Sequence, residues 1–233
     1  MRSTISTFFM SFFILVLISC GGKDKKSPEP GPGIPGKDTT LTGQPGTADS
    51  TLAPVRSFIE KGLDKWAGSF TGFTIDSFRM TQTTSFGEED HKETTDLKEF
   101  YELYKPSLGF SPDSSQFIDM YSSGIMLEKK GKKIIASGDA DQGVMLYNLG
   151  SKAWTRIAFF GPSAGIEEAV WTSPTSFILA GMMVNDNGDK VPLIMLGDVN
   201  SKSLRWFESN AVRPKSSKYE PSGMEKLKID EWE

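Results

Sequence analysis

Two aspartates in one turn are the first residues whose type and spacing could bind a metal ion. Asp139 and Asp141 lie in the oxygen-rich segment SGDADQG. A calcium-binding loop that began at Asp139 would need an oxygen ligand at position 143, glycine at 144 and glutamate at 150. The chain has Gly143, Val144 and Gly150 there. We therefore expect a turn between strands and no metal site, with Asp139 and Asp141 as the candidates for one.

Ligands for a transition metal are scarce, because the chain has one histidine, His91, and one cysteine, Cys20. Zinc and similar ions are held by several Cys or His side chains together. His91 lies in the polar segment GEEDHKETTD, where we expect it to be solvated. The sequence therefore predicts no metal and no cofactor.

Ser163 lies in GPSAG, which matches the G-x-S-x-G pattern of the nucleophile elbow of α/β-hydrolases. That elbow needs a strand before it, a helix after it, and an acid and a histidine downstream. A strand-like segment precedes Ser163, but His91 lies upstream and the following residues are strand-like. We therefore expect Ser163 to lie in a loop and to have no catalytic role.

Carboxylates are the remaining groups that could act as acid and base. Glu167 and Glu168 are adjacent, so a regular strand would point them to opposite faces. We assign no catalytic residue and predict that the protein is not an enzyme. A hydrolase whose carboxylates come from distant parts of the chain is the alternative.

Tryptophan could bind sugars by stacking, and the chain has five of them. Trp154 and Arg156 share one face of an expected strand, and Trp206 shares a strand face with Leu204. Trp154, Arg156 and Trp206 are therefore the candidates for ligand binding, and a carbohydrate-binding module is a further alternative. Burial between layers is the commoner fate of aromatic residues in such sheets, and we expect it here.

The first twenty residues have the pattern of an export signal. Arg2 provides a positive start, and residues 8–18 form an apolar run shorter than the roughly 20 residues that span a bilayer. The tetrad LISC, which ends at Cys20, resembles a bacterial lipobox. This resemblance implies that a signal peptide, residues 1–19, is removed and that Cys20 carries a lipid anchor with acyl chains such as palmitate. Two or more acyl chains anchor a protein stably.

The expected location follows from the residue after Cys20 and from the charge. The residue after Cys20 is Gly21. An Asp at that position would resemble the signal that retains lipoproteins in the inner membrane of many Gram-negative species. We therefore expect an outer-membrane lipoprotein whose domain lies in the periplasm or at the cell surface. Without residues 1–19 the chain has 25 basic and 30 acidic residues, a net charge of −5. That charge argues against nucleic acid as a partner and leaves a protein or polysaccharide of the envelope.

The lipid-bearing Cys20 would be followed by a flexible tether over residues 20–54. Residues 21–54 contain seven Gly and six Pro and almost no large apolar side chains. Such a segment buries too little apolar surface to offset its ordering entropy. As a coil it would span about 30 Å, and about 90 Å when extended.

A single β-rich domain is expected over residues 55–233. Its first part, 55–108, has a mixed pattern. A short helix could bring Phe58, Leu63 and Trp66 to one side, the segment FTIDSFRMTQTTSF is strand-like, and DLKEFYELYKP is helix-like up to its proline.

From residue 109 to 211 strand-like segments follow one another. GFSPDSSQFIDMYS and VWTSPTSFILAG share an aromatic residue, a Ser-Pro corner and a Phe-Ile pair, and MLYNLGSKAW aligns with MLGDVNSKSL. The offset is sixty to sixty-two at the corners and fifty at the second pair. Two meanders that differ in the length of an inner hairpin explain both offsets.

The segments FSPDSSQFIDMYS and VMLYNLGSKAWTRI resemble strands of WD-repeat-like bacterial β-propeller blades. The resemblance covers about 100 residues and implies four strands in each repeat. A closed propeller has at least four blades of about 40 residues, for which this chain has no room. We expect a mainly β fold in which antiparallel meanders form two blade-like four-stranded sheets, as an incomplete propeller or a sandwich. One or two short helices would precede them, and residues 212–233 would form a C-terminal tail.

Overall fold

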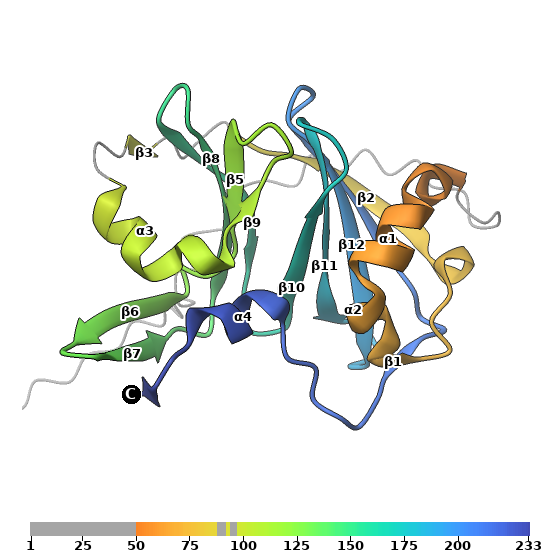
Figure 1. The fold of residues 1–233 in the computed structure, drawn as a ribbon. Coiled ribbons are helices and arrows are strands. Elements are labelled where there is room, and N and C mark those ends of the chain that lie inside the picture. The colour runs from red at the N-terminus through yellow and green to blue at the C-terminus, as the bar shows by residue number, and fades with distance from the viewer. Residues whose placement is uncertain (1–49, 88–91, 94–96) are drawn as a thin grey trace, which may run out of the picture. The chain divides into compact units, whose positions relative to one another are not determined.

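The computed structural model describes residues 50–87, 92–93 and 97–233, which belong to one compact unit, Leu41–Glu233. The signal peptide, Cys20, the tether up to residue 49 and His91 lie outside the described residues. The fold is mainly β with antiparallel sheets and a few short helices, as the sequence predicts (Figure 1). None of the described helices is both long and apolar enough to cross a membrane.

The helical segments are short. They are η1 (Ser50–Val55), α1 (Arg56–Gly62), α2 (Asp64–Gly68), η2 (Ile75–Ser77), α3 (Lys98–Tyr104), η3 (Lys105–Ser107) and α4 (Ser222–Leu227). Ile59, Leu63 and Trp66 recur at helical spacing and are buried at 2% exposure or less. Phe58 does not share their buried side as expected, because it is 37% exposed.

Two five-stranded sheets form the centre of the domain. The strands are β1 (Phe70–Thr71), β2 (Arg79–Ser85), β3 (Lys92–Glu93), β4 (Gly109–Phe110), β5 (Gln116–Asp119), β6 (Ile125–Lys130), β7 (Lys133–Gly138), β8 (Gln142–Asn148), β9 (Ala153–Phe160), β10 (Ala164–Trp171), β11 (Ser176–Val184), β12 (Lys190–Asp198), β13 (Ser203–Glu208), β14 (Arg213–Pro214) and β15 (Glu231–Trp232). The first sheet has the order β4-β5-β8-β9-β3 and the second has the order β10-β11-β12-β13-β2.

The two sheets have one topology. Each takes four antiparallel strands from its own repeat and adds one edge strand, β3 or β2, from the part of the chain before the repeats. In the first repeat the hairpin β6–β7 is inserted between β5 and β8, and the C-terminal strand β15 pairs with it in parallel. The insertion accounts for the two offsets between the repeats.

The two Ser-Pro corners form equivalent backbone hydrogen bonds. The N–H of Ser111 donates to the carbonyl of Gln116 at 2.9 Å, and the N–H of Thr172 donates to the carbonyl of Ser176 at the same distance. The corners also contact each other, because Gln116 Nε2 donates to the carbonyl of Pro174 at 2.6 Å. The two similar sequence segments around the corners therefore form a true structural repeat.

The β8–β9 and β12–β13 turns are equivalent as well. The side-chain oxygen of Asn148 accepts the N–H of Ser151 at 2.9 Å, and that of Asp198 accepts the N–H of Ser201 at 2.8 Å. Lys152 and Lys202 then adopt positive φ values of 56° and 49°. Both turns are thus stabilised by the same side-chain hydrogen bond and contain a lysine with positive φ at the same position.

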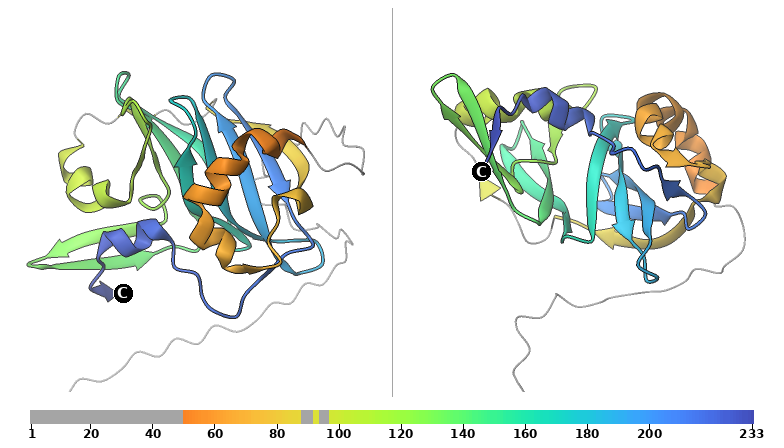
Figure 2. Two further views of the ribbon diagram at one scale, coloured as in Figure 1. Left: turned by 45° about the vertical axis from the view of Figure 1, so that its right-hand side comes forward. Right: turned by 90° about the horizontal axis from the view of Figure 1, so that it is seen from below.

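The two sheets stack so that the face that carries the equivalent residues points in the same direction in both. Ile118 and Leu146 of the first sheet pack in a core shared with Phe177 of the second sheet. Their counterparts in the second sheet, Ile178 and Leu196, pack in another core under η1, α1 and α2. Figure 2 shows these helices on one face of the second sheet, while α3 covers the opposite face of the first sheet. The helices α1 and α2 therefore take the place that a third sheet would have in the stack.

Candidate functional site

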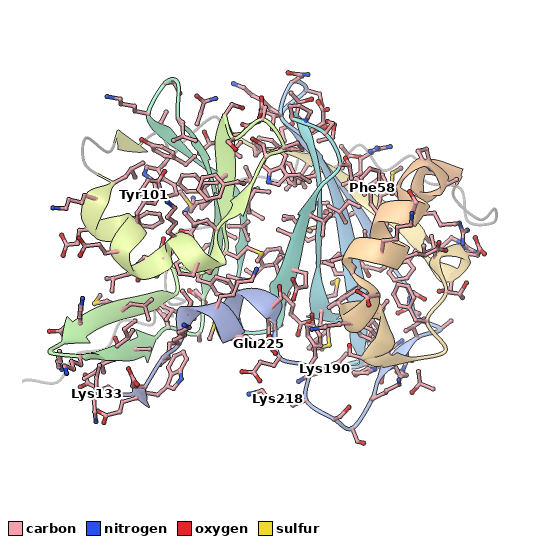
Figure 3. The ribbon with its side chains drawn as sticks, in the orientation of Figure 1. Phe58, Tyr101, Lys133, Lys190, Lys218 and Glu225 are labelled. Atoms are coloured by element: carbon pink, nitrogen blue, oxygen red, sulfur yellow. The ribbon has the colours of Figure 1, made fainter. Side chains whose placement is uncertain are left out.

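A cavity of about 310 Å³ opens where η1 and α1 meet the end of the second sheet. We call it the η1 pocket. Its lining residues are Pro54, Val55, Phe58, Thr172, Ser176, Phe177, Leu196, Gly197, Asp198, Ser203 and Arg205. The volume is at the lower end of the range of about 300–1,000 Å³ that is usual for small-molecule sites. Figure 3 labels Phe58, which α1 presents at this end of the sheet.

The register of the second sheet sets polar side chains in one row across this pocket. Ser176 pairs with Asp198, and Asp198 pairs with Ser203. Residues that are directly opposite in neighbouring strands point to one face of the sheet. The next row on the same face contains Leu196 and Arg205. The pocket therefore combines hydroxyl groups, one carboxylate and one guanidinium.

Asp198 is held in the ionised state by its turn. The N–H of Ser201 donates to Asp198 Oδ1, and the hydroxyls of Ser201 and Ser176 donate to its two oxygens at 2.9 and 3.2 Å. Hydrogen bonds to the charged form lower a pKa, and those from Ser201 hold the pKa of Asp198 below its usual value. The row thus carries a fixed negative charge.

Arg205 is the unpaired charge of the pocket. Its side chain makes no hydrogen bond or ion pair with any residue that the structure describes. By comparison, Arg213 donates to Asp189 at 3.0 Å, Arg56 pairs with Asp76, and Arg156 lies over the ring of Phe159 at 5.5 Å. A guanidinium offers five N–H donors in a planar fork, so Arg205 has its full capacity to bind an anion.

The first repeat has a smaller pocket at the equivalent place. It has a volume of about 170 Å³, and Gln116, Asn148, Ala153 and Thr155 line it. These residues correspond in turn to Ser176, Asp198, Ser203 and Arg205 of the η1 pocket, by the offsets of the repeat. At these equivalent positions one copy has uncharged side chains and the other has a carboxylate with a guanidinium. The one charged residue that lines the smaller pocket is Lys202, from the turn of the second repeat.

A further cavity, of about 320 Å³, lies at the start of β10 and includes Ser163, Glu167 and Lys190. Ser163 is exposed in the turn between β9 and β10, and a strand follows it where a nucleophile elbow needs a helix. The loop expected for Ser163 is therefore confirmed. Figure 3 labels Lys190, which lies toward the opposite end of the second sheet from Phe58.

The adjacent glutamates differ in what they contact. Glu168 is buried, and its carboxylate accepts the hydroxyls of Tyr219 and Ser222, each at 2.7 Å. It also accepts the N–H of Ser222 at 2.6 Å, so it binds the C-terminal segment to β10. Glu167 accepts only the indole N–H of Trp66, at 2.9 Å, among the bonds of the described residues. Glu168 therefore serves the fold, and Glu167 faces a cavity.

The aspartates proposed as metal candidates lie in a turn. The N–H of Asp139 donates to the carbonyl of Gly124 at 2.8 Å, and Asp139 Oδ1 accepts the N–H of Ala140. Asp141 follows in the same turn before β8. Within the described residues, no group of three or more His, Cys, Asp or Glu side chains is placed to hold a metal ion.

The candidate ligand residues Trp154, Arg156 and Trp206 are not brought together. Trp154 is 7% exposed and packs with Phe117 and other aromatic rings under α3. Trp206 lies at the edge of the core between the sheets and donates its N–H to Thr84 at 2.9 Å. Both rings are structural, so the candidate site contains neither. No protein-family model matches the chain, and no curated protein or solved structure matches it either.

Proposed function

We propose that this chain is a lipid-anchored cell-envelope protein whose β-rich domain binds a ligand in the η1 pocket and does not catalyse a reaction. The lipobox at Cys20 and Gly21 after it support an outer-membrane anchor. The Gly- and Pro-rich stretch before η1, residues 21–49, would act as a tether to the domain. Residues 50–54, which the sequence assigns to the tether, belong instead to η1, where Leu52 is 1% exposed in the core. The protein would contact the membrane through its lipid and an envelope protein or polysaccharide through its domain.

The observation that carries the binding function is the unpaired Arg205 inside an open pocket. A charged side chain that lines a cavity without a partner favours a ligand of opposite charge, which would replace the water around it. The neighbouring Phe58, which is 37% exposed, offers an apolar surface at the same place. Both features suit recognition and require no reaction.

Membrane fractionation tests the anchor. Cys20→Ala should move the protein from the membrane fraction to the soluble fraction of the envelope, because the thiol that accepts the lipid is lost. Ser27→Ala, a change in the tether, should leave the protein in the membrane fraction. Unchanged partitioning of the Cys20→Ala protein would refute the lipid anchor.

Binding to envelopes tests the pocket. The Cys20→Ala protein can be added to washed envelopes from cells that lack the protein, and its co-sedimentation measured over a range of concentrations. We expect saturable binding that Arg205→Ala weakens by about tenfold, since one charge-assisted contact is lost. Arg213→Ala removes an arginine outside the pocket and should not change binding. Equal binding by all three proteins would remove the η1 pocket from the proposal.

A carboxylate hydrolase is the second candidate, and Glu167 favours it. Burial raises the pKa of Glu167, which is a property of carboxyl groups that act as general acids. However, a hydrolase of this kind needs a second carboxylate, and Glu168 is occupied by Tyr219 and Ser222. Hydrolysis of ester or glycoside substrates by the purified protein, abolished in Glu167→Gln, would favour this candidate over binding alone.

A further inference from the structure

We propose that the ligand of the η1 pocket is an acidic sugar, that is, a glycan whose rings carry carboxylate groups. This inference rests on the proposed binding function and specifies its ligand. It depends on three neighbouring features of the pocket: the guanidinium of Arg205, the row of Ser176, Asp198 and Ser203, and the apolar wall of η1 and α1.

Arg205 defines the anionic group of the ligand. A planar guanidinium can bind both oxygens of a carboxylate through two parallel hydrogen bonds. The side chain is neither fully exposed nor used by a described partner, so such a contact costs no internal ion pair. The expected contact is therefore a bidentate pair between Arg205 and a ligand carboxylate.

The polar row defines the groups next to that carboxylate. Asp198 is ionised and accepts hydrogen bonds, so it favours a ligand that presents hydroxyl donors. Ser176 and Ser203 lie on either side of Asp198. The hydroxyl of Ser176 donates to Asp198 and that of Ser203 is bonded to Ser201, so both offer acceptor oxygens to the ligand. The charge of Asp198 also works against a doubly charged phosphate close to Arg205, because like charges repel. A single carboxylate beside several hydroxyls fits this arrangement better than a phosphate does.

The opposite wall accounts for the ring of the sugar. Pro54, Val55 and Phe58 give the pocket an apolar side that faces the polar row. A sugar ring has C–H groups on its faces and hydroxyls around its edge, so it can contact an aromatic ring and a polar row together. Phe58 would then replace the tryptophans that the sequence indicates as sugar-stacking residues.

The equivalent pocket of the first repeat provides an internal comparison. Asn148 and Thr155 stand there in place of Asp198 and Arg205, and the cavity has about 170 Å³ instead of about 310 Å³. The repeated backbone alone therefore does not place a carboxylate and a guanidinium in the same pocket. The carboxylate and the guanidinium belong to the second repeat. The smaller pocket has only the ammonium of Lys202, which lacks a planar fork, so we expect acidic sugars to bind at the pocket of the second repeat.

Calorimetric titration with defined oligosaccharides tests the inference. The probes are oligomers of glucuronate and galacturonate, the same oligomers with their carboxyl groups reduced to alcohols, and sugar phosphates. With the Cys20→Ala protein we expect the carboxylate oligomers to bind and carboxyl reduction to weaken binding by about tenfold or more. Arg205→Ala should weaken binding of the carboxylate oligomers by a similar factor, and Phe58→Ala should weaken both the acidic and the reduced oligomers.

Matched variants separate the pocket from general effects of charge. Arg205→Lys keeps the charge without the planar fork, so we expect partial loss of binding. Arg213→Ala should have no effect, and circular dichroism should show that each variant is folded. Equal binding of acidic and reduced oligomers, tighter binding of sugar phosphates, or no binding of any probe would overturn the assignment of an acidic sugar. If envelope binding still depends on Arg205 in that case, the proposed binding function stands and only the ligand class is wrong.

Discussion

At the scale of single residues, a β-bulge gives two adjacent glutamates different roles. The register between β10 and β11 shifts between Ile166 and Glu168, so Glu167 is the extra residue of its strand. In a regular strand Glu167 and Glu168 would point to opposite faces, as the sequence predicts. The bulge instead brings the two carboxylates close enough for the charge of Glu168 to raise the pKa of Glu167 further.

The raised pKa of Glu167 predicts a pH dependence of stability. Burial is the main cause of the raised pKa, so the folded protein binds more protons than the unfolded chain between the usual glutamate pKa and the raised one. Stability that comes from this group is lost as the pH rises through that interval. Glu167→Gln keeps an acceptor for Trp66 without the charge, so it should stabilise the protein at about pH 8 more than at about pH 4.

Urea unfolding at the two pH values measures this difference. Glu225→Gln changes an exposed glutamate and should have nearly the same small effect at both. If Glu167→Gln changes the free energy of unfolding equally at both pH values, the carboxyl of Glu167 does not titrate abnormally.

At the scale of elements, the two sheets use the same corner and the same turn. Lys152 and Lys202 occupy the left-handed region in equivalent turns, a conformation that costs a non-glycine residue about 1 kcal/mol or more. Both turns are anchored to the neighbouring corner, because Leu149 and Val199 donate to the carbonyls of Ser115 and Thr175. In each repeat the Ser-Pro corner and the turn are therefore joined by an equivalent backbone hydrogen bond.

Glycine substitution tests this equivalence. Lys152→Gly and Lys202→Gly should each increase the free energy of unfolding by about 1 kcal/mol, because glycine adopts positive φ without steric cost. Lys132→Gly, at the tip of β6–β7 where φ is not positive, should be neutral or slightly destabilising. A stabilising effect at only one of the two turns in thermal and urea unfolding would argue that they are not equivalent.

Elements that depend on local pattern could be predicted from the sequence. The repeat, the Ser-Pro corners and the helix before Pro106 follow from spacing and composition. Of the strand-like segment 73–86 only the second half is a strand, β2, because Ile75–Ser77 forms η2. The added edge strands could not be predicted, because β2 pairs with β13 across more than 100 residues of sequence. For the same reason Phe58 and Arg205 line one pocket only in the folded chain. The candidate tryptophans had the right chemistry for sugars, but Trp154 is buried under α3 and Trp206 packs at the edge of the core between the sheets, whereas Trp232 of β15 is 56% exposed.

At the scale of the whole domain, Gln142 joins the two sheets. Its Nε2 donates to the carbonyls of Met120 and Ile166 at 3.0 and 2.9 Å, and its Oε1 accepts the N–H of Ile166 at 2.7 Å. Since Gln142 starts β8 and Ile166 lies in β10, one side chain fixes the edge of the second sheet against the first.

Removal of this side chain should weaken the junction. Gln142→Ala should lower the free energy of unfolding by about 2–4 kcal/mol, because three hydrogen bonds are lost and partly buried backbone groups of Ile166 are left unpaired. Gln82→Ala changes an exposed residue of β2 and should alter the free energy of unfolding by less than about 0.5 kcal/mol. Equal effects of the two substitutions in denaturant unfolding would show that Gln142 does not stabilise the contact.

Photo-cross-linking in intact cells tests whether the η1 pocket holds a ligand of the cell envelope. A photoreactive phenylalanine analogue is placed at position 58, in the pocket, or at position 159, where Phe159 is 57% exposed on the other sheet. We expect an adduct at position 58 that is lost when Arg205→Ala is added, and no such adduct at position 159. Absence of an adduct at position 58, or an adduct that does not depend on Arg205, would show that the η1 pocket holds no such ligand.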